Sequence, residues 1–220
     1  MKPRNCWSLV GSSPSAELIR NFVRVNSRLS APVLLSGEAG SGKDRIARFI
    51  HQGSLFRAQP FQVVDCSEFF SDELGVELFG CSDPSLEKPG VLREFRGGTC
   101  YLARCEEIAP SIQVRLREYI ESGRGEGGQE RGCSRLVFSS STDIASFMRA
   151  GLFDRKLFDT FSGSLLVVDP LRKRQEDLGS LVDYYATACP RGPAAVFSPD
   201  ALEALTSYPW PGNHRELEGE

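Results

Sequence analysis

A glycine-rich loop between an apolar run and a helical pattern constrains the fold more than any other stretch. Pro32-Val33-Leu34-Leu35-Ser36 leads into the loop, and the helical pattern of residues 45–50 follows it. This order is that of a P-loop, in which backbone N–H groups and the positive end of a helix form an anion-binding concavity. We therefore expect the loop to bind nucleotide phosphates, with Lys43 reaching the β- and γ-phosphates. Its residues are Gly37, Glu38, Ala39, Gly40, Ser41, Gly42, Lys43 and Asp44.

The last residue of this loop departs from the generic motif. A P-loop usually ends in Ser or Thr, whose hydroxyl ligates Mg²⁺, whereas this loop ends in Asp44. A carboxylate there could hold the metal only differently or through water. ATP or ADP is the expected cofactor, with or without Mg²⁺, and no side chain is assigned as a metal ligand.

Composition limits the class of protein. The chain has 220 residues, of which 40% are hydrophobic and 25% charged, so it can bury a real core. No stretch approaches the roughly 18 consecutive apolar residues of a membrane helix, and no signal-peptide apolar region follows Met1. We expect a cytoplasmic protein without a membrane partner. Because the net charge is −3, no global basic field indicates direct DNA binding.

The seven cysteines are an odd number and form no C-x-x-C pair. This pattern favours reduced thiols over disulfides or a zinc site, and we expect several of them to be small buried hydrophobes. The histidines, His51 and His214, are too few and too separated for a metal cluster, and both are expected at the surface.

Five apolar runs of strand length alternate with helical patterns. The expected strands are 33–35, 61–64, 100–102, 136–138 and 165–168, and the expected helices between them are 43–52, 111–122 and 143–150. Such alternation predicts an α/β fold with a parallel sheet and helices on both faces, and ligands at the carboxyl ends of the strands.

Strand patterns stop after Pro170, and helical patterns take over. They cover 178–188 and 199–207, separated by the breaker of residues 190–193, and the second has Ser198 as N-cap and Pro199 at its first position. A further helix begins at 215–218, so we expect the chain to be truncated there. The predicted division is a nucleotide-binding core at 1–170 and a small helical subdomain at 171–220.

Several segments, in the same order, resemble the central AAA+ domain of bacterial enhancer-binding proteins, the ATPases that remodel sigma-54 RNA polymerase. Beside the P-loop they are Val10-Gly11-Ser12-Ser13-Pro14, Pro60 to Cys66, Glu77-Leu78-Phe79-Gly80, Gly97-Gly98-Thr99, Pro170 to Asp177 and Trp210 to Leu217. The resemblance implies a P-loop AAA+ parallel sheet flanked by helices and followed by a small helical lid. It places Val10 and Gly11 beside the adenine, and it makes Arg215 the sensor II arginine that contacts the phosphates from the lid. The family's loop carries an acid after the lysine, so Asp44 follows its pattern.

The catalytic positions of this family are altered. Counted without a gap from Gly97-Gly98-Thr99, the Walker B Asp-Glu positions fall on Ala103 and Arg104, which cannot hold Mg²⁺ or act as a base. Only a slip by three residues would bring Glu106 and Glu107 there, so no other catalytic residue is assigned.

Further departures concern the residues that sense and complete the site. The switch asparagine falls on Asp65, the sensor I asparagine on Ser141, and the two trans-acting arginine fingers on Asp154 and Thr160. The sigma-54 contact loop, GAFTGA, is replaced by the shorter segment 81–89, which contains two prolines.

These observations predict a degenerate sigma-54 interaction domain: an ATP-binding AAA+ module for transcriptional regulation or assembly, defective in hydrolysis and in sigma-54 activation. Two alternatives stay open. One is an active ATPase whose site is rearranged around Glu106, Glu107 or Asp65, and the other is a nucleotide-free scaffold in which Arg104 fills the metal site. By family analogy, the expected partners are further copies or AAA+ relatives in a mixed ring, and RNA polymerase or other transcription proteins.

Overall fold

A five-stranded parallel sheet forms the centre of the molecule. The computed structural model describes residues 9–81, 89–123, 134–188 and 198–219. The strands are β1 (Val33–Ser36), β2 (Phe61–Asp65), β3 (Thr99–Ala103), β4 (Arg135–Ser140) and β5 (Leu165–Val167), in the order β2-β3-β4-β1-β5. All four neighbouring pairs are parallel. Each strand lies where an apolar run predicts it, so the predicted α/β parallel sheet is confirmed.

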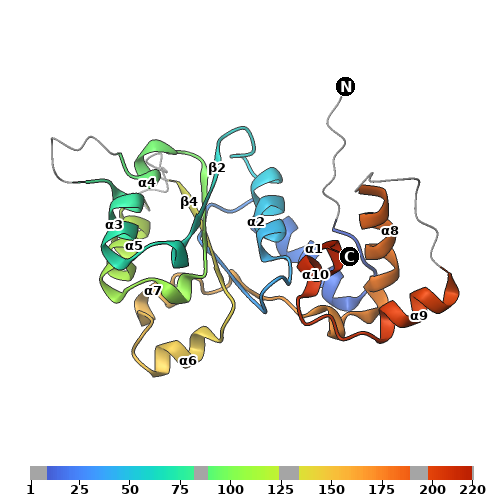
Figure 1. Ribbon diagram of the computed structural model, residues 1–220. Coiled ribbons are helices and arrows are strands. Elements are labelled where there is room, and N and C mark those ends of the chain that lie inside the picture. The colour runs from blue at the N-terminus through green and yellow to red at the C-terminus, as the bar shows by residue number, and fades with distance from the viewer. Residues whose placement is uncertain (1–8, 82–88, 124–133, 189–197, 220) are drawn as a thin grey trace.

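Helices cover both faces of the sheet, as predicted. α1 (Pro14–Asn26) and α2 (Lys43–Gln52) lie on one face, and α3 (Ser71–Phe79), α5 (Pro110–Gly123) and α7 (Arg155–Asp159) lie on the other (Figure 1). Side chains of β1 alternate between the two layers: Leu34 packs in one core, and Val33 and Leu35 pack in the other. This alternation is the period of a strand buried on both faces.

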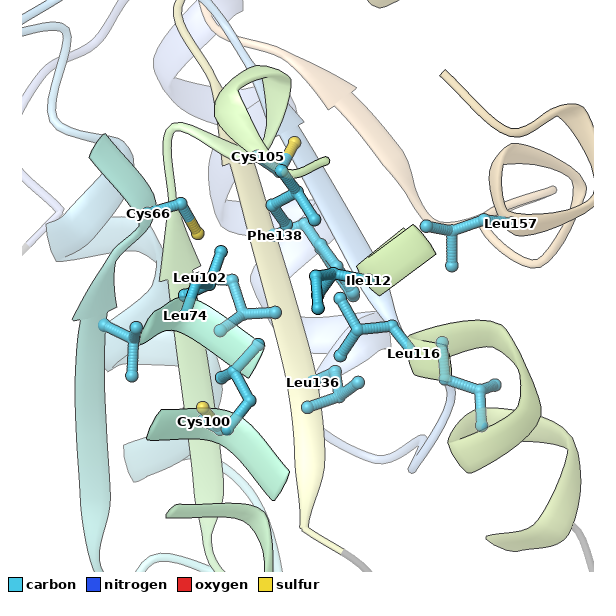
Figure 2. Close-up of a cluster of buried hydrophobic side chains, with 14 of the residues drawn as sticks. Cys66, Leu74, Cys100, Leu102, Cys105, Ile112, Leu116, Leu136, Phe138 and Leu157 are labelled. Carbon is cyan, nitrogen blue, oxygen red and sulfur yellow. The ribbon is translucent and has the colours of Figure 1, made fainter. Parts of the chain in front are cut away.

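The larger core lies beneath α3 and α5. Figure 2 shows Leu102, Leu136 and Phe138 of the central strands facing Ile112 and Leu116 of α5. Three free cysteines, Cys66, Cys100 and Cys105, are buried in the same cluster, which confirms their expected role as small hydrophobes. Burial raises the pKa of the Cys100 thiol to about 12, so it stays protonated and packs as an apolar group.

The C-terminal helices form a small subdomain with its own core. They are α8 (Leu178–Ala188), α9 (Pro199–Ser207) and α10 (Asn213–Gly219), and they lie beside α1 and α2, away from α3 and α5 (Figure 1). Their shared core contains Leu171, Leu178, Leu181, Val182, Tyr185, Trp210 and Leu217. The Ser198 hydroxyl caps α9 by accepting from the Ala201 N–H at 3.2 Å. The predicted breaker at 190–193 lies outside the described residues, as does most of segment 81–89.

Some elements were not predicted. α1, α3, α4 (Val91–Glu94) and α7 are absent from the sequence prediction, although Ser13 followed by Pro14 is a start signal for α1. The Ser13 hydroxyl accepts from the Ala16 N–H at 3.0 Å. The remaining short elements in the described ranges are α6 (Ile144–Arg149), which the pattern at 143–150 predicts, and 3₁₀ turns at Cys66–Glu68, Cys105–Glu107, Leu171–Lys173 and Gln175–Asp177.

The expected surface position of His51 is wrong. Its ring is buried beneath the edge of the sheet, and its Nδ1 lies 2.9 Å from the hydroxyl of Thr99 on β3. A hydroxyl partner of this kind allows an imidazole to be buried in its neutral form. Among the described helices, none combines the length and apolarity needed to cross a membrane.

Candidate nucleotide site

The P-loop connects the carboxyl end of β1 to the first turn of α2. Gly40 (φ 73°) and Gly42 (φ 92°) adopt left-handed conformations that glycine tolerates without a Cβ clash. Gly42 is also the N-cap of α2, and because it has no side chain to cap the helix, the first N–H groups of α2 are left for a ligand. The loop therefore has the backbone geometry of an anion cradle.

Lys43 is folded over this loop. It is only 7% exposed, and its Nζ donates to the carbonyl oxygens of Gly37 at 2.5 Å and Glu38 at 2.7 Å. Burial lowers the pKa of Lys43 to about 8, against the opposing effect of the charges on Glu106 and Asp44. An anion bound in the cradle would give the ammonium a stronger partner than two carbonyl groups.

A small cavity lies beside the loop, between the core and the helical subdomain. Its volume is about 50 Å³, and its walls include Val10, Ser41, Gly42 and His214. Ser41 is 2% exposed, and within the described part of the chain its hydroxyl has no hydrogen-bond partner. Ligand pockets usually exceed about 300 Å³, so a nucleoside would enter only after the walls move apart. Val10, which the resemblance places beside the adenine, is one of the residues that line this cavity.

Gly11, the other residue expected near the adenine, packs against the buried carboxylate of Asp177. A Cβ at Gly11 would lie 2.5 Å from the Asp177 carboxyl carbon, so this position has no room for a side chain. Asp177 accepts from the backbone N–H of Ser13 at 2.8 Å and from the Ser13 hydroxyl at 2.6 Å. It also lies 3.4 Å from the Nε of Arg174. The N-terminal segment is thereby fastened to the start of the helical subdomain.

The first turn of α10 rests directly on the P-loop. The His214 N–H donates to the Gly40 carbonyl at 3.0 Å, and the Asn213 side chain donates to the Ala39 carbonyl at 3.1 Å. A Cβ at Gly40 would lie 2.2 Å from the Gly212 carbonyl oxygen, so glycine is required for this close approach. Sequence reasoning did not assign Asn213 or His214 to the site.

A charged contact reinforces this docking. Arg172 makes two hydrogen bonds to the Glu38 carboxylate, one of them 2.7 Å long. These bonds hold the pKa of Glu38 at about 2, well below its usual value. Glu38 is assigned to the cradle from the sequence, but in this conformation its carboxylate is bonded to Arg172 at the start of the helical subdomain.

Arg215 lies on the same side of the loop. Its side chain is exposed, and its Cβ would be 3.3 Å from a Cβ at Gly40. Its positive charge also lowers the pKa of Lys43, so the two cations are electrostatic neighbours. This position suits contact with phosphates held in the cradle.

His214 lies in a polar network between the two parts of the molecule. Its Nε2 is 3.1 Å from an Arg174 guanidinium nitrogen, and its Nδ1 is 3.1 Å from the Tyr185 hydroxyl. Burial and the charges of Arg174 and Arg45 lower the pKa of His214 to about 3. Because arginine can only donate, Nε2 accepts and Nδ1 carries the proton. The expected surface position of this histidine is therefore wrong.

The strand to which the resemblance assigns the Walker B positions is regular. β3 pairs with β2 residue for residue, ending with Ala103 opposite Asp65, and it contains no bulge. Arg104 follows in a left-handed conformation (φ 56°), and its Nε donates to an Asp65 carboxylate oxygen at 2.6 Å. A second guanidinium bond to Asp65 makes the pair bidentate. Arg104 and Asp65, to which the ungapped count assigns the family's catalytic glutamate and switch asparagine, thus form an ion pair.

Glu106 reaches the site without any slip of register. The 3₁₀ turn at Cys105–Glu107 follows Arg104 and returns the chain toward β4, where the Ser141 N–H donates to Glu106 Oε1 at 2.9 Å. Glu107 is exposed. Of the two glutamates assigned conditionally from the sequence, the structure brings Glu106 to the cradle side and leaves Glu107 in solvent.

The two positions to which the resemblance assigns the arginine fingers have structural roles in α7. Asp154 caps this helix by accepting from the Leu157 N–H at 2.6 Å, and the Thr160 hydroxyl donates to the Leu157 carbonyl at 2.7 Å. The neighbouring cations, Arg155 and Lys156, are exposed.

Comparison with known proteins agrees with this geometry. Residues 9–165 match the family described as the sigma-54 interaction domain. The chain belongs to this family. Residues 172–219 match the AAA+ ATPase lid domain, so the helical subdomain that docks on the P-loop of this sigma-54 interaction domain is its lid.

The relatives of this sigma-54 interaction domain are bacterial regulators. It is 35% identical over 222 residues to the response regulator protein PilR of Pseudomonas aeruginosa, with 96% of this chain and 50% of PilR covered. It is 31% identical over 236 residues to the Nif-specific regulatory protein of Klebsiella oxytoca, with 99% and 45% covered. The crystal structure of NtrX from Brucella abortus in complex with ADP superimposes with a TM-score of 0.83 at 26% identity, with 97% and 50% covered. The chain thus spans about half the length of these relatives.

Proposed function

We propose that this domain binds ATP or ADP between the P-loop and the lid, hydrolyses ATP slowly or not at all, and acts as a nucleotide-dependent regulatory or assembly module in transcription. The observation that carries the proposal is the Arg104–Asp65 ion pair beside an otherwise complete phosphate cradle.

Nucleotide binding is supported by the cradle itself. The P-loop offers the free N–H groups of α2, the ammonium of Lys43 and the buried hydroxyl of Ser41. Arg215 adds positive charge from the lid. NtrX, which has the same fold at 26% identity, has been crystallised with ADP and with ATP. Bound nucleotide would stabilise the closed arrangement of core and lid.

Weak hydrolysis is supported by the groups beside the cradle. Ala103 has no oxygen for a metal, and Arg104 stays protonated and pairs with Asp65, so neither can polarise an attacking water. The positions assigned to the fingers hold Asp154, which caps α7 and pairs with Arg117 of α5, and Thr160, which bonds within α7. An arginine finger is worth roughly 10³ to 10⁵ in rate, so this loss alone would bring turnover near background.

The partners are proposed from the family. The sequence has no GAFTGA loop between Gly80 and Gly90, which supports a domain that does not activate sigma-54 polymerase. A module without fingers could still join a ring with AAA+ relatives that supply them, and the nucleotide state would then control assembly. RNA polymerase and other transcription proteins are the partners expected of such a regulator.

Calorimetry and turnover assays on the purified chain test the proposal. We expect ATP and ADP to bind, and Lys43→Ala to abolish binding, because the ammonium is the main charged group of the cradle. A ligand at 100 times its Kd adds about 2.7 kcal/mol of stability, which corresponds to a rise in melting temperature of roughly 5–10 °C for a chain of this size.

Two results would contradict the proposal in different ways. Lys43-dependent hydrolysis at about one ATP per second would establish the active-ATPase alternative. The absence of both binding heat and thermal shift at millimolar nucleotide would establish the nucleotide-free scaffold.

A further inference from the structure

One carboxylate beside the cradle has no assigned role. Glu106 belongs to the 3₁₀ turn that follows β3, and its Oε1 is held by the backbone N–H of Ser141, immediately after β4. The preceding residue, Ser140, accepts from the N–H of Gly37 at 3.2 Å, and Gly37 in turn accepts from the Lys43 ammonium. A short chain of contacts therefore connects Glu106 to the first glycine and the lysine of the P-loop.

The second oxygen of this carboxylate is buried without a partner. Among the described residues, Glu106 Oε2 has no hydrogen-bond partner, and its solvent-accessible surface is below 1 Å². An ionised carboxylate oxygen held out of water is costly unless a cation or donor approaches it. The Lys43 ammonium is close enough for Glu106 to be the largest charge that raises its pKa.

The group that such an oxygen suits is a divalent cation bound with a nucleotide. Mg²⁺ is usually held by one or two carboxylates, several waters and substrate phosphates, so a full set of protein ligands is not required. The described part of the chain contains no cluster of three metal-ligating side chains, and Ala103 has no oxygen to offer. Among the described residues, Glu106 Oε2 is a carboxylate oxygen that is buried near the cradle without a partner, so it fits the cation when phosphates and water complete the coordination.

We propose that Glu106 is the divalent-cation ligand of this domain, held by the Ser141 N–H and acting from one turn beyond the altered Walker B strand. This inference rests on the proposed nucleotide binding. It does not restore hydrolysis, because Arg104 and Asp65 remain paired and Glu107 is exposed. Glu106 instead makes nucleotide binding dependent on Mg²⁺: without the cation its charge repels the phosphates, and with the cation it attracts the complex.

Calorimetric binding of ATP in Mg²⁺ and in EDTA tests the inference. The wild-type domain should bind ATP about tenfold more tightly with Mg²⁺ than without it, a difference of about 1.4 kcal/mol. Glu106→Gln keeps the bond from Ser141 and removes the charge. It should bind ATP with similar affinity in both conditions, and it should bind metal-free ATP more tightly than the wild type does.

Two variants and a second readout make the result interpretable. Glu107→Gln removes the neighbouring exposed charge and should keep the wild-type Mg²⁺ dependence. Glu106→Asp keeps the charge on a shorter side chain, so it should retain part of that dependence even if the glutamine variant is unstable. Electron paramagnetic resonance of Mn²⁺ with ADP should show bound metal in the wild type and much less in Glu106→Gln.

The possible outcomes distinguish a failure of the Glu106 inference from a failure of the proposed nucleotide binding. Equal Mg²⁺ dependence in the wild type and in Glu106→Gln would overturn the role of Glu106 and leave nucleotide binding intact. Failure of the wild type to bind nucleotide in either condition would overturn both.

Discussion

Asp177 is the buried charge on which the junction between the N-terminal segment and the lid depends. Its side chain is 0% exposed, and it accepts two hydrogen bonds from Ser13, at 2.8 and 2.6 Å, while it pairs with Arg174 at 3.4 Å. Asp177→Ala would leave the buried Arg174 without this partner and both Ser13 donors unsatisfied. Breaking a buried ion pair by removing one partner costs about 3–5 kcal/mol.

Equilibrium urea denaturation followed by circular dichroism measures this loss. For a domain of this size, a loss of about 3–5 kcal/mol also corresponds to a fall in melting temperature of roughly 6–20 °C. Glu176→Ala is the matched control, because Glu176 is the exposed neighbour in the same turn and its removal should change stability by no more than about 0.5 kcal/mol. A loss below about 1 kcal/mol in Asp177→Ala, with an unchanged denaturant slope, would show that the junction does not depend on this carboxylate.

Two further predictions concern the P-loop. The pKa of Lys43 is about 8 in the free domain, and bound phosphate favours the charged ammonium, so ADP affinity should fall above pH 8 by at most tenfold per pH unit. Binding above pH 8 should also take up a proton, which calorimetry in two buffers detects. An ADP affinity that stays constant between pH 7 and pH 9.5 would contradict this prediction. Gly40→Ala should weaken ADP binding and loosen the contact with the lid, because its Cβ would lie 2.2 Å from the Gly212 carbonyl oxygen. The control is Gly151→Ala, at a glycine with a similar left-handed backbone but no atom within 4 Å of the added Cβ. It should lower the free energy of unfolding by only about 1–2 kcal/mol. Equal effects of the two alanines on ADP affinity would show that the close approach is unimportant.

The sheet could be predicted from the sequence because its strands are buried on both faces. Such strands appear as continuous apolar runs, such as Leu34-Leu35 and Val137-Phe138, and these need no knowledge of the partner strand. α4 and α7 were missed because they are short, with four and five residues, and too few turns exist to establish a helical period. α3 carries its buried Leu74 and Leu78 next to Gly75, which weakens the helical signal.

The candidate site likewise contains residues that the sequence identifies and residues that only the fold brings into place. The P-loop is contiguous, so its eight residues could be identified without a structure. The position of Glu106 could not, because it depends on the left-handed turn at Arg104 and on an N–H group 35 residues further along the chain. The docking of Asn213 on Ala39 joins residues 174 positions apart, and only the folded lid brings them together.

The bidentate pairing of Arg104 with Asp65 also makes the two residues interdependent. Arg104→Glu alone would set two carboxylates against each other at the ends of β2 and β3, and Asp65→Asn alone would deprive the guanidinium of its acidic partner. The smallest coherent change at this end of the sheet is therefore a double substitution.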